Sequence, residues 1–224
     1  MPDLRRRATD PELLDEGVPE VEALRSLGDL RLVNRWLGGR RSLLRAVMPL
    51  LDGRQRPSLL DVGCGSADLP HLLVRRAGPR LLAVGLDVKL LHVRQAPGGI
   101  QRVVADVRRV PFAARSFDVV TASLFLHHFD APEVPEVLSS LFALCRRALV
   151  VNDLHRGLVP YFFGRVTFPW VFRSPVSVID GLLSIRRAFR PGELQQAFAD
   201  AGIRGARIHR RFPYRLVAVA ERTE

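Results

Sequence analysis

The stretch Leu59-Leu60-Asp61-Val62-Gly63-Cys64-Gly65-Ser66-Ala67-Asp68 decides the fold of this chain. An apolar run over Ser58–Val62 predicts a buried strand, which stops at two glycines one residue apart, and a helical pattern begins near Asp68. Gly63 and Gly65 have no Cβ, so the backbone can turn tightly there and approach a ligand closely. A strand, a glycine turn and a helix in this order are typical of a nucleotide-type cofactor site in an open α/β sheet.

Position 68 separates two kinds of cofactor. A dinucleotide loop follows the pattern G-x-G-x-x-G, and its third glycine falls where this chain has Asp68. A carboxylate at that place would repel a pyrophosphate. We therefore expect a ligand with positive charge or hydroxyl groups, and an NAD-dependent dehydrogenase is disfavoured.

The glycine turn resembles motif I of the class I S-adenosylmethionine (SAM)-dependent methyltransferases, D/E-x-G-x-G-x-G, with Ala67 at the last glycine. The resemblance covers roughly Leu51 to the end of the chain. It implies SAM as the cofactor and S-adenosylhomocysteine as its product. It also implies that the turn binds the methionine part of the cofactor, through Asp61, Gly63, Cys64, Gly65 and Ser66.

Alternating apolar and helical segments predict the rest of the fold. Five apolar runs indicate buried parallel strands: Ser58–Val62, Arg80–Leu86, Ile100–Val104, Phe117–Ala122 and Ala148–Val151. Helical stretches between them include Leu69–Arg76, Leu90–Gln95 and Val134–Arg146. A helix from Pro191 to Ala201 precedes two more strands, Ala206–Arg211 and Tyr214–Ala220, which we expect to form an antiparallel hairpin. Repeated βα units indicate an α/β, doubly wound sheet; with the hairpin it resembles the seven-stranded, Rossmann-like methyltransferase sheet.

The segments on either side of this sheet are expected to cover it. The pattern from Glu12 to Leu51 is helical and breaks at Gly38-Gly39. We predict an N-terminal helical cap over residues 1–50 and a SAM-binding domain over residues 51–224, with a helical lid inserted at residues 154–190. The lid holds seven aromatic rings: Tyr161, Phe162, Phe163, Phe168, Trp170, Phe172 and Phe189. They indicate an apolar or aromatic acceptor; a second core, or contact with a membrane surface beside Arg165 and Arg173, are the alternatives.

Two carboxylates follow the next two strands. Asp87 lies about 20 residues past the glycine turn, where an acidic residue accepts hydrogen bonds from ribose hydroxyls, and Val88 adjoins it. In the family that motif I resembles, an acidic residue after the third strand meets the adenine amino group, and its neighbours read the ring. That place holds Ala105, Asp106 and Val107. A helix cap for Asp87 and an ordinary loop aspartate for Asp106 are the alternatives.

The segment Ser123-Leu124-Phe125-Leu126-His127-His128 resembles motif IV of the small-molecule SAM methyltransferases. It lacks the N/D-P-P-Y/F signature of amino-methylating nucleic-acid enzymes. The resemblance implies that Ser123 and Leu124 contact the methionine part of SAM. A phenol or carbon acid must lose a proton to accept a methyl group, and a histidine titrating near neutrality suits that task. His127 and His128 are therefore the candidate bases, unless both serve only as polar packing.

Two further positions complete the predicted site. Asp153 follows the fifth strand and would orient a histidine or bind a substrate hydroxyl, or else cap a helix. The pattern Asn34-x-x-Leu37-Gly38-x-x-Arg41 is similar to the N-terminal part of quinone-biosynthesis C-methyltransferases. Arg40 or Arg41 would reach the methionine carboxylate or an acidic substrate; a plain helix break is the alternative.

The composition of the chain limits which partners and which cellular compartment we expect for it. The chain has 224 residues and a formal net charge of +11, but 33 of its 34 basic residues are arginine, spread over the whole sequence and not gathered in one block. This distribution disfavours a nucleic-acid partner. The two cysteines do not make a disulfide framework, which is typical of a reducing cytoplasm. No run of apolar residues is long enough to span a bilayer, and no metal site is expected.

We therefore expect a SAM-dependent methyltransferase of secondary metabolism. Its acceptor is expected to be a small aromatic, phenolic, quinone or polyketide-type compound, methylated on oxygen or carbon by direct in-line transfer. A non-catalytic, regulatory SAM-binding protein and an RNA methyltransferase remain the alternatives.

Overall fold

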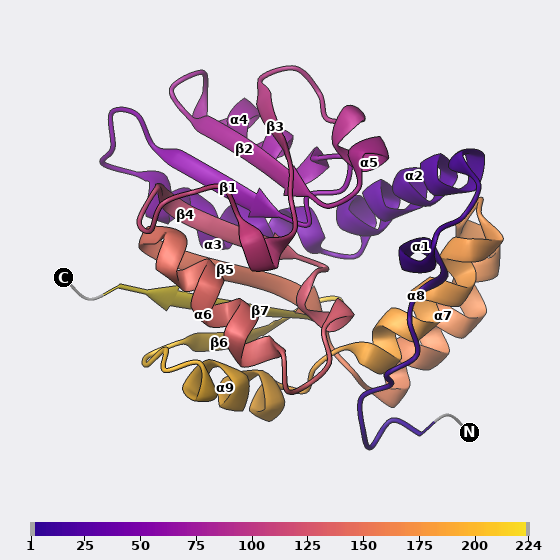
Figure 1. Ribbon diagram of the computed structural model, residues 1–224. Coiled ribbons are helices and arrows are strands. Elements are labelled where there is room, and N and C mark those ends of the chain that lie inside the picture. The colour runs from indigo at the N-terminus through magenta and orange to yellow at the C-terminus, as the bar shows by residue number, and fades with distance from the viewer. Residues whose placement is uncertain (1–2, 223–224) are drawn as a thin grey trace.

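Seven strands form one mixed sheet in the order β3-β2-β1-β4-β5-β7-β6. The computed structural model describes residues 3–222 (Figure 1). The strands are β1 (Ser58–Val62), β2 (Leu82–Asp87), β3 (Ile100–Val104), β4 (Phe117–Ser123), β5 (Cys145–Leu154), β6 (Arg207–Arg211) and β7 (Arg215–Glu221). The first five are parallel, β7 runs antiparallel to β5, and β6 pairs antiparallel with β7. The predicted doubly wound sheet with a terminal hairpin is confirmed.

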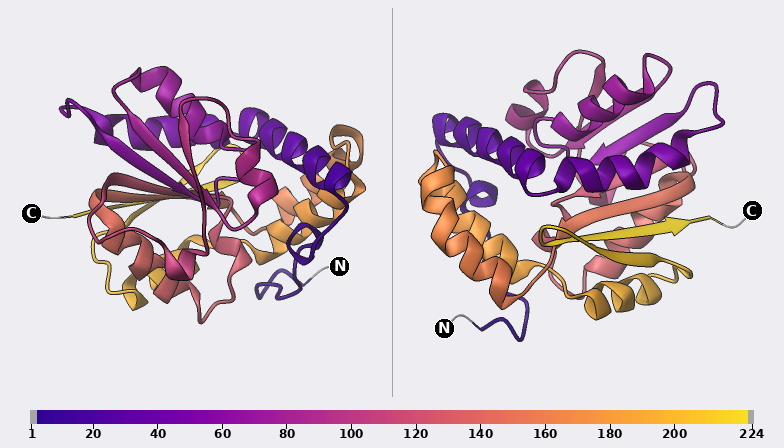
Figure 2. Two further views of the ribbon diagram at one scale, coloured as in Figure 1. Left: turned by 45° about the horizontal axis from the view of Figure 1, so that its top comes forward. Right: turned by 180° about the vertical axis from the view of Figure 1, so that it is seen from behind.

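Helices cover both faces of the sheet and one of its edges (Figures 1 and 2). They are α1 (Leu13–Glu16), α2 (Glu20–Trp36), α3 (Gly39–Leu51), α4 (Asp68–Ala77), α5 (Leu90–Arg94), α6 (Val134–Leu144), α7 (Leu158–Val171), α8 (Pro175–Arg187) and α9 (Pro191–Asp200), with short 3-10 turns η1 (Val107–Arg109) and η2 (Leu126–His128). Helices α3 and α4 pack on one face, and α6 and α9 pack on the other. Helices α1, α2, α7 and α8 gather beside the carboxyl ends of the parallel strands.

The core consists of one apolar layer on each face of the sheet. In β1, Leu60 and Val62 belong to the layer under α6 and α9, whereas Leu59 belongs to the layer under α3 and α4. Successive strand residues point to opposite faces, so a parallel strand covered on both sides needs apolar residues at nearly every position. This explains the unbroken apolar runs of the sequence.

Strand β5 is longer than its apolar run predicts. It begins at Cys145, which pairs with Phe117 of β4, so helix α6 ends at Leu144 rather than at Arg146. The strand lies between β4 and β7 and pairs along its length with one or both of them. Apolar periodicity marks only the part of it that is buried on both faces.

The N-terminal helices divide between two roles. Helix α3 packs on the sheet, while α1 and α2 lie beside its carboxyl edge. The break between α2 and α3 falls at the predicted glycines: Gly38 has φ +77°, and a Cβ there would lie 2.8 Å from the Phe212 carbonyl oxygen. The division of the chain at residue 50 stays a prediction.

Three buried charged groups fix the segment that precedes α2. The Asp180 carboxylate accepts hydrogen bonds from the backbone N–H groups of Leu13 and Leu14, at 2.8 and 2.9 Å. Arg187 donates to the Asp10 carbonyl at 2.6 Å, and Arg156 donates to the Leu4 carbonyl at 3.1 Å. The start of the described chain is therefore held by α8 and by Arg156, which lies between β5 and α7. Within residues 3–222, no helix is both long and apolar enough to cross a membrane.

Candidate active site

A cavity of about 380 Å³ opens at the carboxyl ends of the parallel strands. Its walls come from the glycine turn, from the loops after β2, β3 and β4, and from α1, α2, α7 and α8. Twelve of the thirteen predicted cofactor residues line it: Asp61, Gly63, Cys64, Gly65, Ser66, Asp87, Val88, Ala105, Asp106, Val107, Ser123 and Leu124. The structure thus brings residues from four separate loops to one space.

The glycine turn fits tightly under an aromatic ring. Gly63 has φ +64°, and a Cβ at this position would lie 2.2 Å from Cδ2 of Phe125. Real atoms do not approach so closely, so Gly63 is required as long as Phe125 covers the turn. Ala67 also has a positive φ, 55°, at the position where the family pattern has its last glycine.

Two buried carboxylates, Asp61 and Asp87, face the end of the cavity that the glycine turn forms. Burial raises the pKa of Asp61 to about 7, although Thr121 donates a 2.5 Å hydrogen bond to it. Asp87 accepts 2.9 Å hydrogen bonds from the backbone N–H groups of Gly65 and Lys89. Burial opposes the charge on Asp87, but His92 and these N–H groups outweigh it and lower its pKa. Asp87 therefore fixes the glycine turn as well as facing the cavity.

The structure does not support the prediction for Arg40. Arg40 is absent from the cavity lining, and its guanidinium lies 3.4 Å from the Asp68 carboxylate, which also accepts a hydrogen bond from Asn34. The nearest partner of Arg40 is thus a carboxylate of the protein. Arg31 of α2, which the sequence analysis missed, is the arginine that contacts the turn, through a 2.8 Å hydrogen bond to Ser66 Oγ. Asp106 lines the cavity and also caps η1, because its side chain accepts a hydrogen bond from Arg108 N–H.

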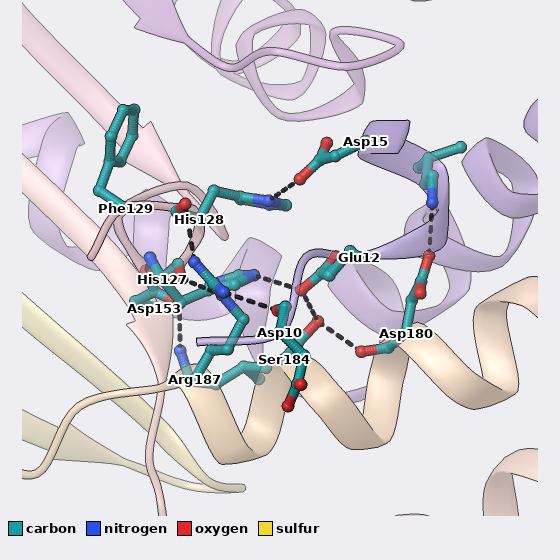
Figure 3. Close-up of polar contacts among 12 residues, drawn as sticks. Asp10, Glu12, Asp15, His127, His128, Phe129, Asp153, Asp180, Ser184 and Arg187 are labelled. Carbon is teal, nitrogen blue, oxygen red and sulfur yellow. Dashed lines mark hydrogen bonds and ion pairs between the residues drawn. The ribbon is translucent and has the colours of Figure 1, made fainter. Parts of the chain in front are cut away.

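The other end of the cavity carries a chain of polar groups centred on His127 (Figure 3). Its Nδ1 lies 2.7 Å from Asp153 Oδ1, and its Nε2 lies 3.5 Å from Glu12 Oε1. Ser184 of α8 donates a 2.6 Å hydrogen bond to the same Glu12 oxygen. His127 is only 2% exposed and Asp153 is fully buried, so a carboxylate faces each ring nitrogen away from bulk water.

These carboxylates decide the charge of the ring. Burial disfavours protonated His127, but the charges and hydrogen bonds of Asp153 and Glu12 outweigh it and raise the pKa of His127 to about 10. Burial likewise opposes both carboxylates, yet His127 lowers the pKa of Asp153 to about 2 and lowers that of Glu12. At neutral pH His127 is therefore a cation between two carboxylates.

His128 stands beside this chain. Its ring stacks on that of His127 with the centroids 4.4 Å apart, and its Nδ1 lies 2.6 Å from Asp15 Oδ2. Arg187 donates 2.8 Å hydrogen bonds to the carbonyls of both histidines. The backbone that carries the two rings is thus held by a buried guanidinium.

The same groups have the composition of a metal site. Glu12, His127 and His128 offer ligand atoms within 4.8 Å of one another. Each histidine has its Nδ1 against a carboxylate, as metal-binding histidines commonly do. These three residues could hold a divalent cation.

The aromatic lid differs from the prediction. Of its seven rings only Phe168 and Phe172 line the cavity. Phe189 is buried in the main core, and Phe162, Phe163 and Trp170 are exposed on the outside of α7. Most lid rings therefore do not face the acceptor, and α8 contributes polar side chains to the cavity instead: Ser177, Asp180 and Ser184.

Sequence reasoning missed Glu12, Asp15, Asp180 and Ser184 in this site. Asp180 and Ser184 are four residues apart, so they share one face of a helix, and this spacing could have indicated a polar helix face. Nothing in the sequence linked that face to the Glu12–Asp15 segment. Asn152, which precedes Asp153 in β5, is fully buried and contacts the Gly39 carbonyl and Ser123.

Comparisons with known proteins agree with this architecture. Residues 59–148 match the family model described as a methyltransferase domain. The demethylmenaquinone methyltransferase of Chlorobaculum parvum is 24% identical over 173 residues, covering 77% of this chain and 64% of that protein. The nocamycin O-methyltransferase of Saccharothrix syringae is 33% identical over 114 residues, covering 47% of this chain and 40% of that protein. The chain thus spans less than two thirds of the length of these curated relatives.

Among solved structures, the plantazolicin methyltransferase BpumL with a desmethylPZN analog and SAH superposes with a TM-score of 0.68. It is 14% identical, and the superposition covers 92% of this chain and 97% of that one. The fold, the match over residues 59–148 and the relatives together show that the chain contains a methyltransferase domain of the class I SAM-dependent type. The family resemblance of the glycine turn is confirmed.

Proposed function

We propose that this protein transfers the methyl group of SAM to a small acceptor that carries an ionisable hydroxyl group or an acidic C–H group. One observation supports this most: a single cavity joins the glycine turn to the buried chain Glu12–His127–Asp153. A methyl donor bound at the glycine turn would thus lie next to the groups that remove a proton from the acceptor.

The residues at the turn fit the proposed cofactor. Asp61 and Asp87 offer carboxylate oxygens to hydroxyl and ammonium groups, and Leu86, Val88 and Val107 provide apolar wall for a flat ring. When bound, SAM supplies a methyl group activated by its sulfonium. The protein's task is to hold the acceptor atom in line with that methyl group and to keep water away.

The polar chain would prepare the acceptor. Glu12 takes the proton of the acceptor's hydroxyl or C–H group, and the His127 imidazolium stabilises the anion that forms. Asp153 keeps the ring oriented and protonated, so its role is positioning. This assignment revises the expectation that His127 itself is the base, because its ring is already protonated at neutral pH.

The relatives indicate the class of acceptor. Their names refer to a demethylmenaquinone and to nocamycin, so one acceptor is a quinone and the other is methylated on oxygen. Phe168 and Phe172 give this cavity an aromatic wall next to the polar chain. We propose a phenol, quinol or enolised polyketide as acceptor.

Calorimetry with SAM and a transfer assay with labelled SAM test the proposal. We expect SAM binding, followed by transfer to members of a panel of phenols, quinols and β-diketones. Absence of binding at millimolar SAM would refute it. Binding without transfer to any acceptor would favour a regulatory protein, and transfer to RNA alone would favour the RNA-modifying alternative.

Replacing Asp87 by Ala should weaken SAM binding. The change removes a buried acceptor and frees the Gly65 N–H, and such losses cost about 1–3 kcal/mol, or about 5- to 150-fold in Kd. Calorimetric Kd values for Asp87→Ala and for the exposed control Asp52→Ala measure the effect. An equal Kd for Asp87→Ala and the unsubstituted protein would contradict the ribose assignment.

Removing metals should leave methyl transfer unchanged, because Glu12 and His127 provide the proton chemistry without a cation. The measurement is the transfer rate after dialysis against a chelator, compared with the rate after addition of Zn²⁺, Mn²⁺ or Mg²⁺. A rate that falls on chelation and returns with one metal would instead make Glu12, His127 and His128 a metal centre.

A further inference from the structure

The outer side of α7 is an exposed apolar stripe. It consists of Leu158, Val159, Phe162, Phe163, Val166 and Trp170, all exposed, with Trp170 89% exposed. At 3.6 residues per turn these positions fall within an arc of about 140°. No charged residue lies within the arc, and an ordinary surface helix carries its polar residues on this side.

The stripe continues onto the turn between β6 and β7. The ring of Phe163 lies 5.5 Å from that of Tyr214, and an open groove of about 540 Å³ runs between α7 and this residue. Phe212, two residues before Tyr214, is 89% exposed. We call the six residues of the α7 stripe together with Phe212 and Tyr214 the apolar rim.

Three segments that adjoin near the apolar rim are rich in arginine, although Arg156 and Arg215 among them are buried and Arg31 and Arg40 contact Ser66 and Asp68. Residues 30–51, 154–179 and 201–220 hold thirteen arginines and no aspartate or glutamate. The other 21 basic and 23 acidic residues of the chain nearly balance. The segments adjoin in space, since Arg215 donates a hydrogen bond to the Leu37 carbonyl and His155 N–H donates to that of Tyr214.

We propose that the apolar rim binds peripherally to an anionic lipid bilayer. Exposed aliphatic and aromatic side chains that enter the boundary of a bilayer, next to arginines that face its acidic headgroups, are the features of interfacial membrane binding. Arg165 on α7, Arg173 just after it and Arg211 before the turn are exposed and suited to that contact.

Charge and side-chain type favour a bilayer over other partners. A second copy of the chain would bring two arginine-rich borders together, and like charges repel. Leu158, Val159 and Val166 are aliphatic and cannot stack on bases, as the residues of single-strand nucleic-acid platforms do. A bilayer satisfies both the apolar stripe and the positive border.

The rim is also close to the cavity. Phe168 and Phe172, on the inner side of α7 and at its end, line the cavity whose proposed function is methyl transfer. If that function holds, the bound helix brings the acceptor end of the cavity next to the lipid phase, and an acceptor with an alkyl chain would reach it from there.

Vesicle co-sedimentation of the full chain tests the proposal. We expect binding to phosphatidylcholine vesicles that contain 30% phosphatidylglycerol, and at least about tenfold weaker binding to pure phosphatidylcholine or at high salt. Trp170→Glu should abolish binding. Leu82→Glu, which adds the same charge at an exposed apolar position on the opposite end of the sheet, should not.

Fluorescence adds a readout at the site itself. The chain has two tryptophans, so Trp36→Phe leaves Trp170 as the single reporter, and its emission should shift to the blue on anionic vesicles. Calorimetry should show the same SAM affinity for Trp170→Glu as for the unsubstituted protein, which separates this proposal from the proposed function. The proposal is overturned by absence of vesicle binding, by equal loss in Leu82→Glu, by a dimer that Trp170→Glu dissociates, or by RNA binding that depends on Trp170.

Discussion

Glu12→Gln should lower kcat by about 10² to 10⁴-fold, the usual contribution of a positioned general base. The amide keeps the size of the side chain, and its oxygen still accepts the hydrogen bond from Ser184, so the segment should stay in place. It can no longer take a proton from an acceptor. Steady-state transfer rates with saturating SAM and a phenolic acceptor measure the loss.

Asp10→Asn is the matched control for Glu12→Gln. Asp10 belongs to the same segment, its side chain is 69% exposed, and only its backbone carbonyl contacts the site through Arg187. This variant should keep the original kcat. If Glu12→Gln also keeps it while still binding SAM, Glu12 is not the base, and the polar chain serves only to hold His127.

Gly63→Ala should abolish SAM binding. The added methyl group would lie 2.2 Å from the Phe125 ring, and φ +64° is itself unfavourable for alanine. Either the turn or the ring must move, and both line the cavity. Calorimetry should detect no binding at millimolar SAM, with the thermal transition of the protein recorded to exclude global unfolding.

Two further variants make the reason for this loss testable. Gly98→Ala adds a methyl group where nothing lies within 4 Å, and it should bind SAM normally. Gly63→Ala combined with Phe125→Ala removes the clash but keeps the backbone cost, so binding should return in part. If the double variant binds no better than Gly63→Ala alone, the backbone conformation rather than the ring makes glycine necessary.

The part of the cavity next to the glycine turn could be predicted from the sequence, because its residues lie at the ends of successive strands. Asp61 and Asp87 lie near the ends of β1 and β2, Asp106 follows β3 by two residues, and parallel strands end at one edge of the sheet. Residues that occur at successive strand ends in the sequence therefore lie close together in the folded chain. Arg40 was predicted from a resemblance instead; it lies on helix α3, and its guanidinium is 3.4 Å from the Asp68 carboxylate.

The acceptor side could not be predicted in this way. Glu12 reaches His127 because Asp180 and Ser184 of α8 hold its segment, and no local pattern connects residues so distant in sequence. The prediction that the rings of α7 line the acceptor site was wrong for most of them, for a related reason. An apolar helix predicts burial but does not tell which of its sides is buried, and here Phe162 and Trp170 lie on the exposed side.

The family match over residues 59–148 includes the glycine turn, Asp87, Asp106 and His127. Glu12, Asp153, Asp180 and Ser184, which surround that histidine, all lie outside it. Under the proposed function, donor recognition is thus encoded in the matched central segment, and most groups that act on the acceptor, apart from His127, are encoded in two flanking segments that meet only after folding. On that proposal, substitutions in the flanks would alter which compound is methylated without disturbing the central segment, and the acceptor specificity of proteins that share this segment would be compared through their flanks.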